Sequence, residues 1–338
     1  MPIQQPKTVL ILGARGRFGL AAARAFAAAG WRVVAQIRPG AKTPDCAGVQ
    51  WLPLAVDDTF ALVQAAQGAE VVVHALNPLY TEWETWAMTL LDASLRVARQ
   101  LQALLMLPGA VYNFGAGMPR VLAEDTPQLA DTRKGKIRIA MEQRMQDAAA
   151  PGGVRSVVIR AGDFFGSGTG SWFDMALAKN ITSGKMTYPG ALDVRTAWAY
   201  VPDMAGAFVR VADKLLEAPQ RFAPFEIFHF KGHSLTGSEW AEQLADVAWD
   251  NGWLPPAGKL KIASMPWRLM KAGGMLVPMW RELCEMRYLW KTPHALSGDK
   301  LAALIGPEPH TPLPVAVQLA LQDLGKARSL ACNMPQWA

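Results

Sequence analysis

Residues 8–19 read TVLILGARGRFG, and the order of residue types in them indicates the fold class. Its first five residues are Val, Ile, Leu or Thr, which is typical of a short buried strand, and residues 20–29 form an alanine-rich helical segment. Between them, Gly13 can make a tight turn, Gly16 lets the backbone approach a pyrophosphate, and Gly19 lets the helix pack close to the strand. The order of strand, glycine turn and helix predicts a dinucleotide-binding unit with the phosphates at the helix N-terminus.

The composition is that of a folded globular chain. Its 338 residues allow one large domain or two modest ones. Hydrophobic residues make up 51% and charged residues 18%, a balance that excludes a disordered chain. The three cysteines form no CxxC or Cys/His pattern, so we expect no disulfide framework, no metal site and a reducing, cytoplasmic location. Nine of the 13 tryptophans follow residue 165, so the two halves differ in composition.

The charge pattern suits an anionic small molecule as well as nucleic acid, but several of the basic residues can be assigned to the phosphates of a dinucleotide, so we expect no nucleic-acid partner. The net charge is +6, and the basic residues are scattered along the sequence rather than gathered in one patch. We expect no targeting segment at the N-terminus. Residues 265–280 are apolar but are interrupted by charges and a proline, and a spanning helix needs about 20 apolar residues, so we expect no membrane span. This stretch is predicted to be a helix packed on its own domain; the alternative is a membrane-surface segment or lid.

The second strand suggests which dinucleotide is bound. It covers residues 31–37 and is followed by Arg38, where an NAD-binding unit would place the Asp or Glu that holds the ribose 2′-hydroxyl. A guanidinium can hold a 2′-phosphate with two hydrogen bonds, whereas a carboxylate would repel it. Together with Arg15 and Arg17 in the glycine loop, this favours NADP(H) over NAD(H). The alternative is that Arg38 only ends the strand in solvent.

Strands and helices continue to alternate through the first half of the chain. This alternation predicts an α/β Rossmann fold, a doubly wound parallel sheet whose ligand crevice lies at the carboxyl ends of the strands. The further strands are predicted at 49–54, 70–75, close before 108 and 154–160, and the helices at 60–67, 81–101 and 136–150. The mostly helical second half is predicted to contain helices at 238–249, 265–275, 279–290, 298–304 and 315–324. We expect a nucleotide-binding domain at 1–165, to which 192–232 return, and a substrate-binding or lid region at 166–191 and 233–338.

Five segments together resemble the extended short-chain dehydrogenase/reductase family, which contains nucleotide-sugar epimerases and dehydratases. They are GARGRFG (13–19), VVVHAL (71–76), AVYNFG (110–115), VVIRAGDFFG (157–166) and AWAYVPDMAGAF (197–208). The resemblance covers roughly residues 8–235. The cofactor contacts that we expect from it and from the glycine loop are Gly13, Arg15, Gly16, Arg17, Phe18, Gly19, Arg38, Asp57, Ala75, Leu76, Asn77, Pro108, Gly109, Arg138, Ala161 and Gly162.

The sequence departs from this family where catalysis would be expected. Family enzymes use a Ser or Thr at the end of the fifth strand and a Tyr-x-x-x-Lys pair on the next helix. Here Pro108 stands at the strand end, and Lys134 and Arg138 replace the Tyr and the Lys. An alternative register places Thr132 and Lys136 at these two positions. Neither register restores the usual acid.

Two residues are candidates for the missing acid/base, with Arg138 beside them as the third predicted catalytic residue. Lys134 could serve only if burial or nearby cations lowered its pKa, and the alternative that we favour is a solvated basic helix start near the cofactor phosphates. Tyr112 lies in the loop after the fifth strand; its alternative role is structural.

Other residues are expected to face the substrate. The resemblance places Arg195 as a contact for a substrate anion and Phe164 as a wall that excludes water. Arg160 is expected to contact an anion or to pair with Asp163, and Asp203 is expected to cap a helix. The predicted substrate residues are Tyr80, Asn113, Asp163, Phe164 and Arg195.

These features predict an NADP(H)-dependent oxidoreductase that acts on a small carbonyl or alcohol. The alternatives are a non-catalytic NADP(H)-binding sensor and, third, a nucleotide-sugar epimerase or dehydratase. A homodimer is one assembly that the sequence allows. The tryptophans and methionines of the second half either line an apolar pocket or form a core, and helical spacing favours the core.

Overall fold

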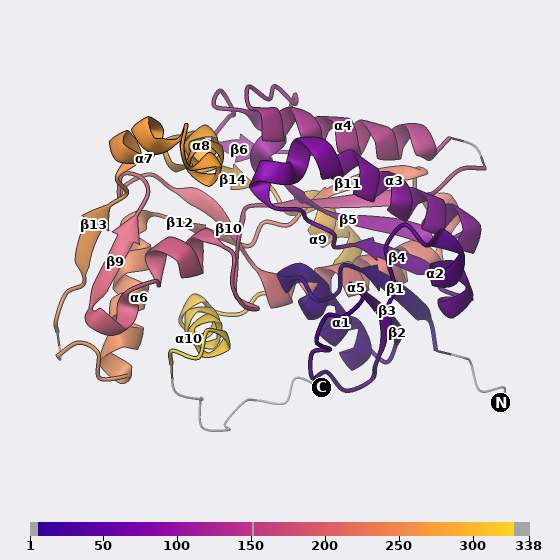
Figure 1. Cartoon of the computed structure of the whole chain (residues 1–338), viewed down its shortest axis with the longest axis horizontal. Helices are drawn as coiled ribbons and strands as arrows, with labels where there is room; N and C mark the ends of the chain where they lie inside the picture. The colour runs from indigo at the N-terminus through magenta and orange to yellow at the C-terminus, as the bar shows by residue number, and fades with distance from the viewer. Residues whose placement is uncertain (1–5, 151, 256, 328–338) are drawn as a thin grey trace.

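The central feature of the computed structural model, which describes residues 6–150, 152–255 and 257–327, is a sheet of seven parallel strands (Figure 1). The strands lie in the order β11-β7-β5-β4-β1-β2-β3, which confirms the predicted doubly wound parallel sheet. Their bounds are β1 (Thr8–Leu12), β2 (Arg32–Ile37), β3 (Val49–Pro53), β4 (Val71–His74), β5 (Leu104–Ala110), β7 (Ser156–Ala161) and β11 (Phe225–His229).

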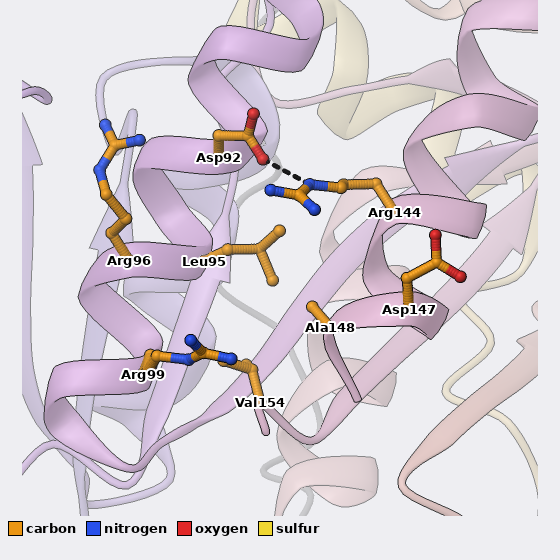
Figure 2. Close-up of a pocket in the computed structure, with 8 residues that line it drawn as sticks. All are labelled: Asp92, Leu95, Arg96, Arg99, Arg144, Asp147, Ala148 and Val154. Atoms are coloured by element: carbon orange, nitrogen blue, oxygen red, sulfur yellow. Dashed lines mark hydrogen bonds and ion pairs between the residues drawn. The ribbon is translucent and has the colours of Figure 1, made fainter. Parts of the chain in front are cut away.

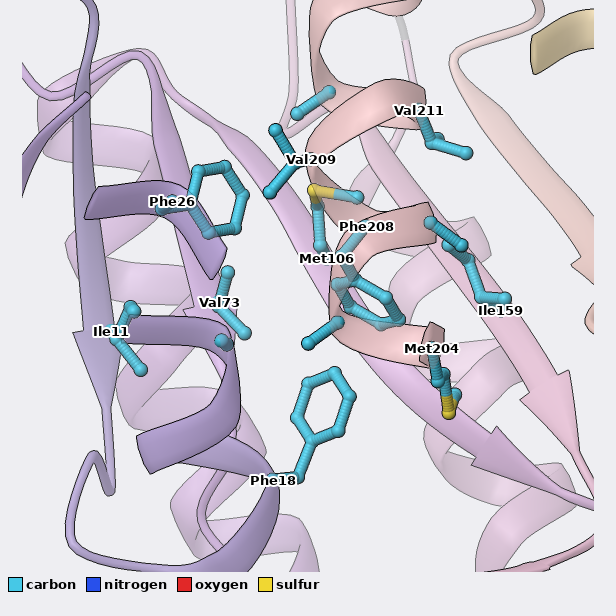
Figure 3. Close-up of a cluster of buried hydrophobic side chains, with 14 of the residues drawn as sticks. Ile11, Phe18, Phe26, Val73, Met106, Ile159, Met204, Phe208, Val209 and Val211 are labelled. Carbon is cyan, nitrogen blue, oxygen red and sulfur yellow. The ribbon is translucent and has the colours of Figure 1, made fainter. Parts of the chain in front are cut away.

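Helices cover both faces of this sheet, so its central strands are apolar on both sides. In β1, Val9 and Ile11 pack into the cluster on one face, and Leu10 and Leu12 pack into the cluster on the other. Figure 3 shows the first of these clusters, with Ile11 facing the aromatic side chains of the covering helices. One face carries α1 (Arg17–Ala28), α5 (Val201–Glu217) and α9 (Asp299–Ile305), and the other carries α2 (Thr59–Ala65), α3 (Trp83–Leu101) and α4 (Arg133–Ala148).

Several predicted boundaries change. Helix α4 begins at Arg133 rather than at 136, because the Thr132 side chain caps it by accepting a hydrogen bond from the backbone N–H of Gly135 at 3.1 Å. The helix predicted at 279–290 divides into α8 (Pro278–Glu285) and a 3₁₀ turn, Met286–Trp290. The earlier start of α4 places the whole KGKIR segment, residues 134–138, on the first turns of this helix.

The prediction that Asp203 caps a helix is wrong. Helix α5 starts two residues earlier, at Val201, so Asp203 lies within its first turn. Its carboxylate instead accepts hydrogen bonds from the backbone N–H and the hydroxyl of Thr311, at 2.6 and 2.7 Å. This carboxylate therefore fastens a distant loop to α5.

A second unit packs around an aromatic core beside the main sheet (Figure 1). Its core includes five buried tryptophans, and the rings of Trp198 and Trp240 meet edge to face with centroids 4.9 Å apart. The tryptophans in this core are Trp172, Trp198, Trp240, Trp267 and Trp290. Thus these five residues form a core rather than the lining of a pocket.

Short strands and helices make up the rest of this unit and its connections. The strands are β6 (Val121–Leu122), β8 (Asp163–Phe165), β9 (Lys185–Tyr188), β10 (Thr196–Tyr200), β12 (His233–Leu235), β13 (Lys261–Ser264) and β14 (Ala295–Leu296). The helices are α6 (Gly237–Asp250), α7 (Trp267–Gly273), α8 (Pro278–Glu285) and α10 (Leu313–Asp323). Strands β12, β10 and β8 form a three-stranded sheet.

Candidate functional site

The glycine loop after β1 is shaped for close backbone approach. Gly13 has φ +79°, and a side chain there would place its Cβ 2.9 Å from the carbonyl oxygen of Ala75. A Cβ at Gly19 would lie 2.5 Å from the carbonyl oxygen of Gly13. Among the described residues no side chain caps α1 at Gly16, so the first N–H groups of this helix are available to an anion. The loop therefore fits the pyrophosphate of a dinucleotide.

Two arginines at this end of the sheet have a buried N–H group without a partner in the described part of the chain. Arg17 donates to the carbonyl oxygens of Phe164 and Gly170, at 3.3 and 2.6 Å, and Arg138 donates to that of Pro108 at 3.3 Å, but the Nε atoms of both are unsatisfied. Burial lowers the pKa of both guanidinium groups, which still remain charged. Buried, incompletely bonded cations favour a polar or anionic ligand.

Phe18, a predicted cofactor residue, has its side chain turned into the core. Its ring is buried in the core beneath α1, 4.7 Å from the ring of Phe208 on α5 (Figure 3). On its other side, the half-buried Phe164 lies 6.1 Å away. Phe18 can therefore offer a ligand only its backbone.

The remaining predicted cofactor residues lie near the carboxyl edge of the sheet. Arg15 is exposed in the glycine loop and Arg38 is exposed directly after β2, and neither has an ion pair within the described residues. Ala75 and Leu76 follow β4 and lie against Gly13. The others also stand at strand ends: Asp57 after β3, Asn77 after β4, Pro108 and Gly109 in β5, and Ala161 and Gly162 at the end of β7.

Two tyrosine hydroxyls meet above this edge. Tyr112 lies in a 3₁₀ turn, Val111–Phe114, that follows β5, and Tyr80 begins the turn before α3. Their hydroxyl oxygens are 2.7 Å apart. Burial raises the pKa of Tyr80 to about 12 and that of Tyr112 well above its usual value, so both hydroxyls stay protonated at neutral pH. The pair can donate a proton to a ligand.

Helix α4 approaches the backbone of Tyr112 closely because Gly135 has no side chain. A Cβ at Gly135 would collide with the carbonyl oxygen of Tyr112. One turn further along α4, the guanidinium of Arg138 stacks over the ring of Trp83 at 4.8 Å, and its charge lowers the pKa of both hydroxyls, although less than burial raises them. The structure thus brings together Tyr80, Tyr112 and Arg138.

Lys134 is buried in an ion-pair cluster. Its ammonium bonds Glu282 and lies 3.0 Å from a carboxylate oxygen of Glu285, and the residue is 1% exposed. Burial alone would raise the pKa of Glu282, but hydrogen bonds from Lys134 and Arg133 outweigh it and hold that pKa below its usual value. The favoured interpretation of a solvated basic helix start is therefore wrong for Lys134.

Sequence reasoning missed Glu282 and Glu285. They stand three residues apart on α8, so they share one helix face and reach the same ammonium group. That spacing was the only local signal, because the two carboxylates lie about 150 residues from Lys134 in the sequence.

Arg160 has neither of its two predicted partners. It is completely buried and makes two hydrogen bonds to the carboxylate of Glu142, at 2.6 and 3.1 Å, so both the anion contact and the Asp163 pair are wrong. Asp163 is half-buried on β8. Burial raises its pKa to about 7, although the nearby charge of Arg17 opposes the shift.

Two predicted substrate residues have partners within the protein. Asn113 is completely buried and donates from its amide to Gln128 at 2.8 Å, while its side-chain oxygen has no partner among the described residues. Arg195 is exposed and donates to the carbonyl oxygen of Ser234 and, at 2.7 Å, to Glu239. A substrate anion would have to compete with Glu239.

A small cavity and a groove lie near α3 and α4. A cavity of about 10 Å³, roughly enough for one water, lies beside Arg138 and is also lined by Asn77 and Trp83. A groove of about 360 Å³ lies between α3 and α4, where Asp92 and Arg144 form an ion pair (Figure 2). This groove reaches Val154, at the amino end of β7, so it is separate from the strand-end site.

Comparison with known proteins identifies the family. The model of the NAD dependent epimerase/dehydratase family matches residues 9–223, well over half of the chain. The chain belongs to the NAD-dependent epimerase/dehydratase family. A search by sequence among curated proteins gives no match.

Solved structures share the fold of this epimerase/dehydratase family member at low sequence identity. A UDP-glucose 4-epimerase from Brucella ovis in complex with NAD is 15% identical, with 95% of this chain and 100% of that chain covered and a TM-score of 0.72. A candidate epimerase from Burkholderia cenocepacia is 20% identical, with 94% and 97% covered and a TM-score of 0.71. The Bordetella bronchiseptica enzyme WbmH in complex with NAD+ is 16% identical, with 95% and 99% covered and a TM-score of 0.70.

Proposed function

We propose that this chain binds a nicotinamide dinucleotide and is an oxidoreductase for a carbonyl or alcohol substrate. Support comes from its family, from the NAD in two structural neighbours, and from the glycine loop beside the unsatisfied Nε atoms of Arg17 and Arg138. When bound, the nicotinamide would supply or accept a hydride. The protein must then supply or accept the matching proton.

The observation that carries this proposal is the 2.7 Å contact between the hydroxyls of Tyr80 and Tyr112. In carbonyl reduction, Tyr112 would give its proton to the substrate oxygen as the carbon receives a hydride. Tyr80 would return a proton to Tyr112 and regain one from solvent water, and the positive charge of Arg138 would stabilise the transient phenolate. Alcohol oxidation would run through the same atoms in reverse.

Lys134 is a weaker candidate for this proton transfer. Its ammonium bonds both Glu282 and Glu285, and these two carboxylates hold it in place. We propose that Lys134 positions the first turn of α4, so that Arg138 reaches the tyrosine pair.

We propose NADP(H) as the preferred cofactor. Arg38 is exposed at the end of β2, where its guanidinium could hold a 2′-phosphate, and no carboxylate follows that strand before Asp45. Arg17 contributes less to this preference than the sequence suggests, because it bonds the 164–170 loop. The two neighbours reported with a cofactor hold NAD, so this preference requires its own test.

A non-catalytic cofactor-binding protein is the second candidate. It is favoured by Pro108 at the strand end and by the ion-paired Lys134 at the position of the family's tyrosine. A nucleotide-sugar epimerase fits the fold, but the same two departures weaken it.

The experiment is a titration with NADPH and NADH followed by a panel of carbonyl compounds, with the absorbance of the reduced nicotinamide as the readout. Cofactor binding with turnover of at least one carbonyl supports the oxidoreductase. Binding without turnover across aldehydes, ketones and nucleotide-sugar derivatives would favour the binding protein.

A further inference from the structure

The most exposed large apolar side chains of the described residues lie together in the short turn between α7 and α8. Met275 is 92% exposed and Leu276 is 88% exposed, with the exposed Val277 beside them and Leu269 on α7. The two helices stand at one edge of the molecule (Figure 1, upper left). Exposed apolar patches of this kind mark interaction surfaces.

Helices α7 and α8 and the turn between them form a hairpin that tertiary contacts hold in place. The exposure of its tip is therefore not that of a loose loop. A Cβ at Gly273 would lie 2.6 Å from the ring of Trp280, which shows how closely α7 and α8 pack. Trp267 anchors the first helix by donating to the carbonyl oxygen of Pro189 at 2.7 Å. At the other end, α8 carries Glu282, which bonds Lys134. The apolar tip is therefore held outward by two anchored helices.

Basic residues outnumber acidic ones in the segment that forms α7, the turn, α8 and the strand before them. Residues 259–287 contain six basic residues, all exposed, and only two acidic residues, Glu282 and Glu285, which are already paired with Arg133 and Lys134. The basic residues are Lys259, Lys261, Arg268, Lys271, Arg281 and Arg287. No ion pair within the described residues involves the first four of them.

We propose that this hairpin docks the protein on an anionic phospholipid surface, with Met275 and Leu276 entering the boundary between headgroups and acyl chains. Apolar side chains that stand beside Lys and Arg residues are typical of an interfacial membrane anchor. A second copy of the chain is the less suitable occupant, because it would bring the same six positive charges against the first set. Among the described residues no helix has the length and apolar character to cross a bilayer, so the contact is with the surface.

The test is sedimentation of the full chain with vesicles of phosphatidylcholine alone and of equal parts phosphatidylcholine and phosphatidylglycerol. We expect binding to the anionic vesicles at least roughly tenfold stronger than to the neutral ones, since several basic residues act together. The double variant Met275→Asp/Leu276→Asp should lose roughly tenfold in binding for each side chain. The control Phe60→Asp, on α2 at the opposite end of the molecule, removes an equally apolar side chain that is 74% exposed and should bind as the wild type does.

A second set of variants distinguishes the effect of the charges near the tip from the effect of the total charge of the protein. Arg268→Gln/Lys271→Gln should weaken binding to the anionic vesicles, whereas Arg96→Gln/Arg99→Gln, which removes the same charge from exposed positions on α3, should not. Cofactor affinity, measured in parallel, should be the same in all variants, so a failed cofactor assignment leaves this test intact. Equal binding to both vesicles, no binding, or binding unchanged by the tip variant would overturn the proposal, as would a tip variant that only abolishes a dimer.

Discussion

The hydroxyl oxygen of Tyr80 lies 2.7 Å from that of Tyr112, although 32 residues separate them in the sequence. The two residues follow β4 and β5, which are neighbouring parallel strands, so their turns leave the sheet side by side. This edge thus presents a protonated pair, and the first turns of α4 beside it carry Lys134 and Arg138.

Replacing Lys134 tests the buried ion-pair cluster. Lys134→Met should destabilise the protein by about 3–5 kcal/mol, because it leaves the carboxylate of Glu282 buried without its main partner. Lys134→Met/Glu282→Leu should recover much of this loss. Urea unfolding measures both variants.

A matched control uses an exposed pair. Arg144→Gln breaks the 2.8 Å contact with Asp92 between α3 and α4, and because this pair is exposed, its loss should cost far less stability than Lys134→Met does. Equal losses for Lys134→Met and Arg144→Gln would contradict the role given to Lys134.

A substitution at Gly135 tests the close approach of α4 to Tyr112. Gly135→Ala should cost about 1–3 kcal/mol, because the new Cβ would collide with the carbonyl oxygen of Tyr112 and approach Ala130 within 2.7 Å. In Gly117→Ala the new Cβ meets nothing within 4 Å, so this control should leave the unfolding free energy nearly unchanged. A stable Gly135→Ala variant would show that α4 is not held this close.

Arg38 tests the cofactor preference. Arg38→Asp should weaken NADPH binding by roughly 10-fold to 100-fold, since a charge-assisted contact with the 2′-phosphate is replaced by repulsion, and should leave NADH binding unchanged. Arg24→Asp on α1 makes the same charge change at another exposed position and should leave both affinities unchanged. Calorimetric titration measures the dissociation constants of both cofactors. An equal loss of affinity for NADPH and NADH would refute the contact between Arg38 and the 2′-phosphate.

Asp163 should contribute a pH-dependent part of the stability. Its folded-state pKa of about 7 lies above its ordinary 3.8, so the folded protein holds this proton more tightly than the unfolded chain does. Its stabilising contribution is therefore complete below the ordinary pKa and is lost as the pH rises to about 7. Relative to Asp163→Asn, the wild type should gain unfolding free energy when the pH falls from about 8 to about 5. A difference that stays constant over that range would count against a raised pKa.

Much of the fold could be predicted because its signals are local. The glycine spacing at 13–19 and the alternation of apolar strands with helices need only neighbouring residues, and the parallel sheet follows from them. The helical spacing of the tryptophans after residue 165 favoured a core over a pocket lining, and five of these tryptophans do form a core, whereas Trp249 is 36% exposed.

The site was predicted less completely because its decisive contacts join distant segments. The ion-pair partners of Lys134 stand on α8. The ion-pair partner of Arg160 is Glu142 rather than Asp163, which lies only three residues away in the sequence. Tyr80 and Tyr112 were both expected near the ligand, but their hydrogen bond depends on the order of strands in the sheet. A charge or hydroxyl finds its partner through tertiary packing, which no local pattern encodes.

The most direct test of the central claim is the rate of hydride transfer in Tyr112→Phe, measured with saturating cofactor and a carbonyl that the wild type reduces. We expect a rate roughly 10²-fold to 10⁴-fold below the wild type, with unchanged cofactor affinity, because the proton donor is gone while the ring remains. Tyr200→Phe, which removes a hydroxyl from the aromatic core of the second unit, should keep the wild-type rate. A Tyr112→Phe variant that transfers hydride as fast as the wild type would contradict the account.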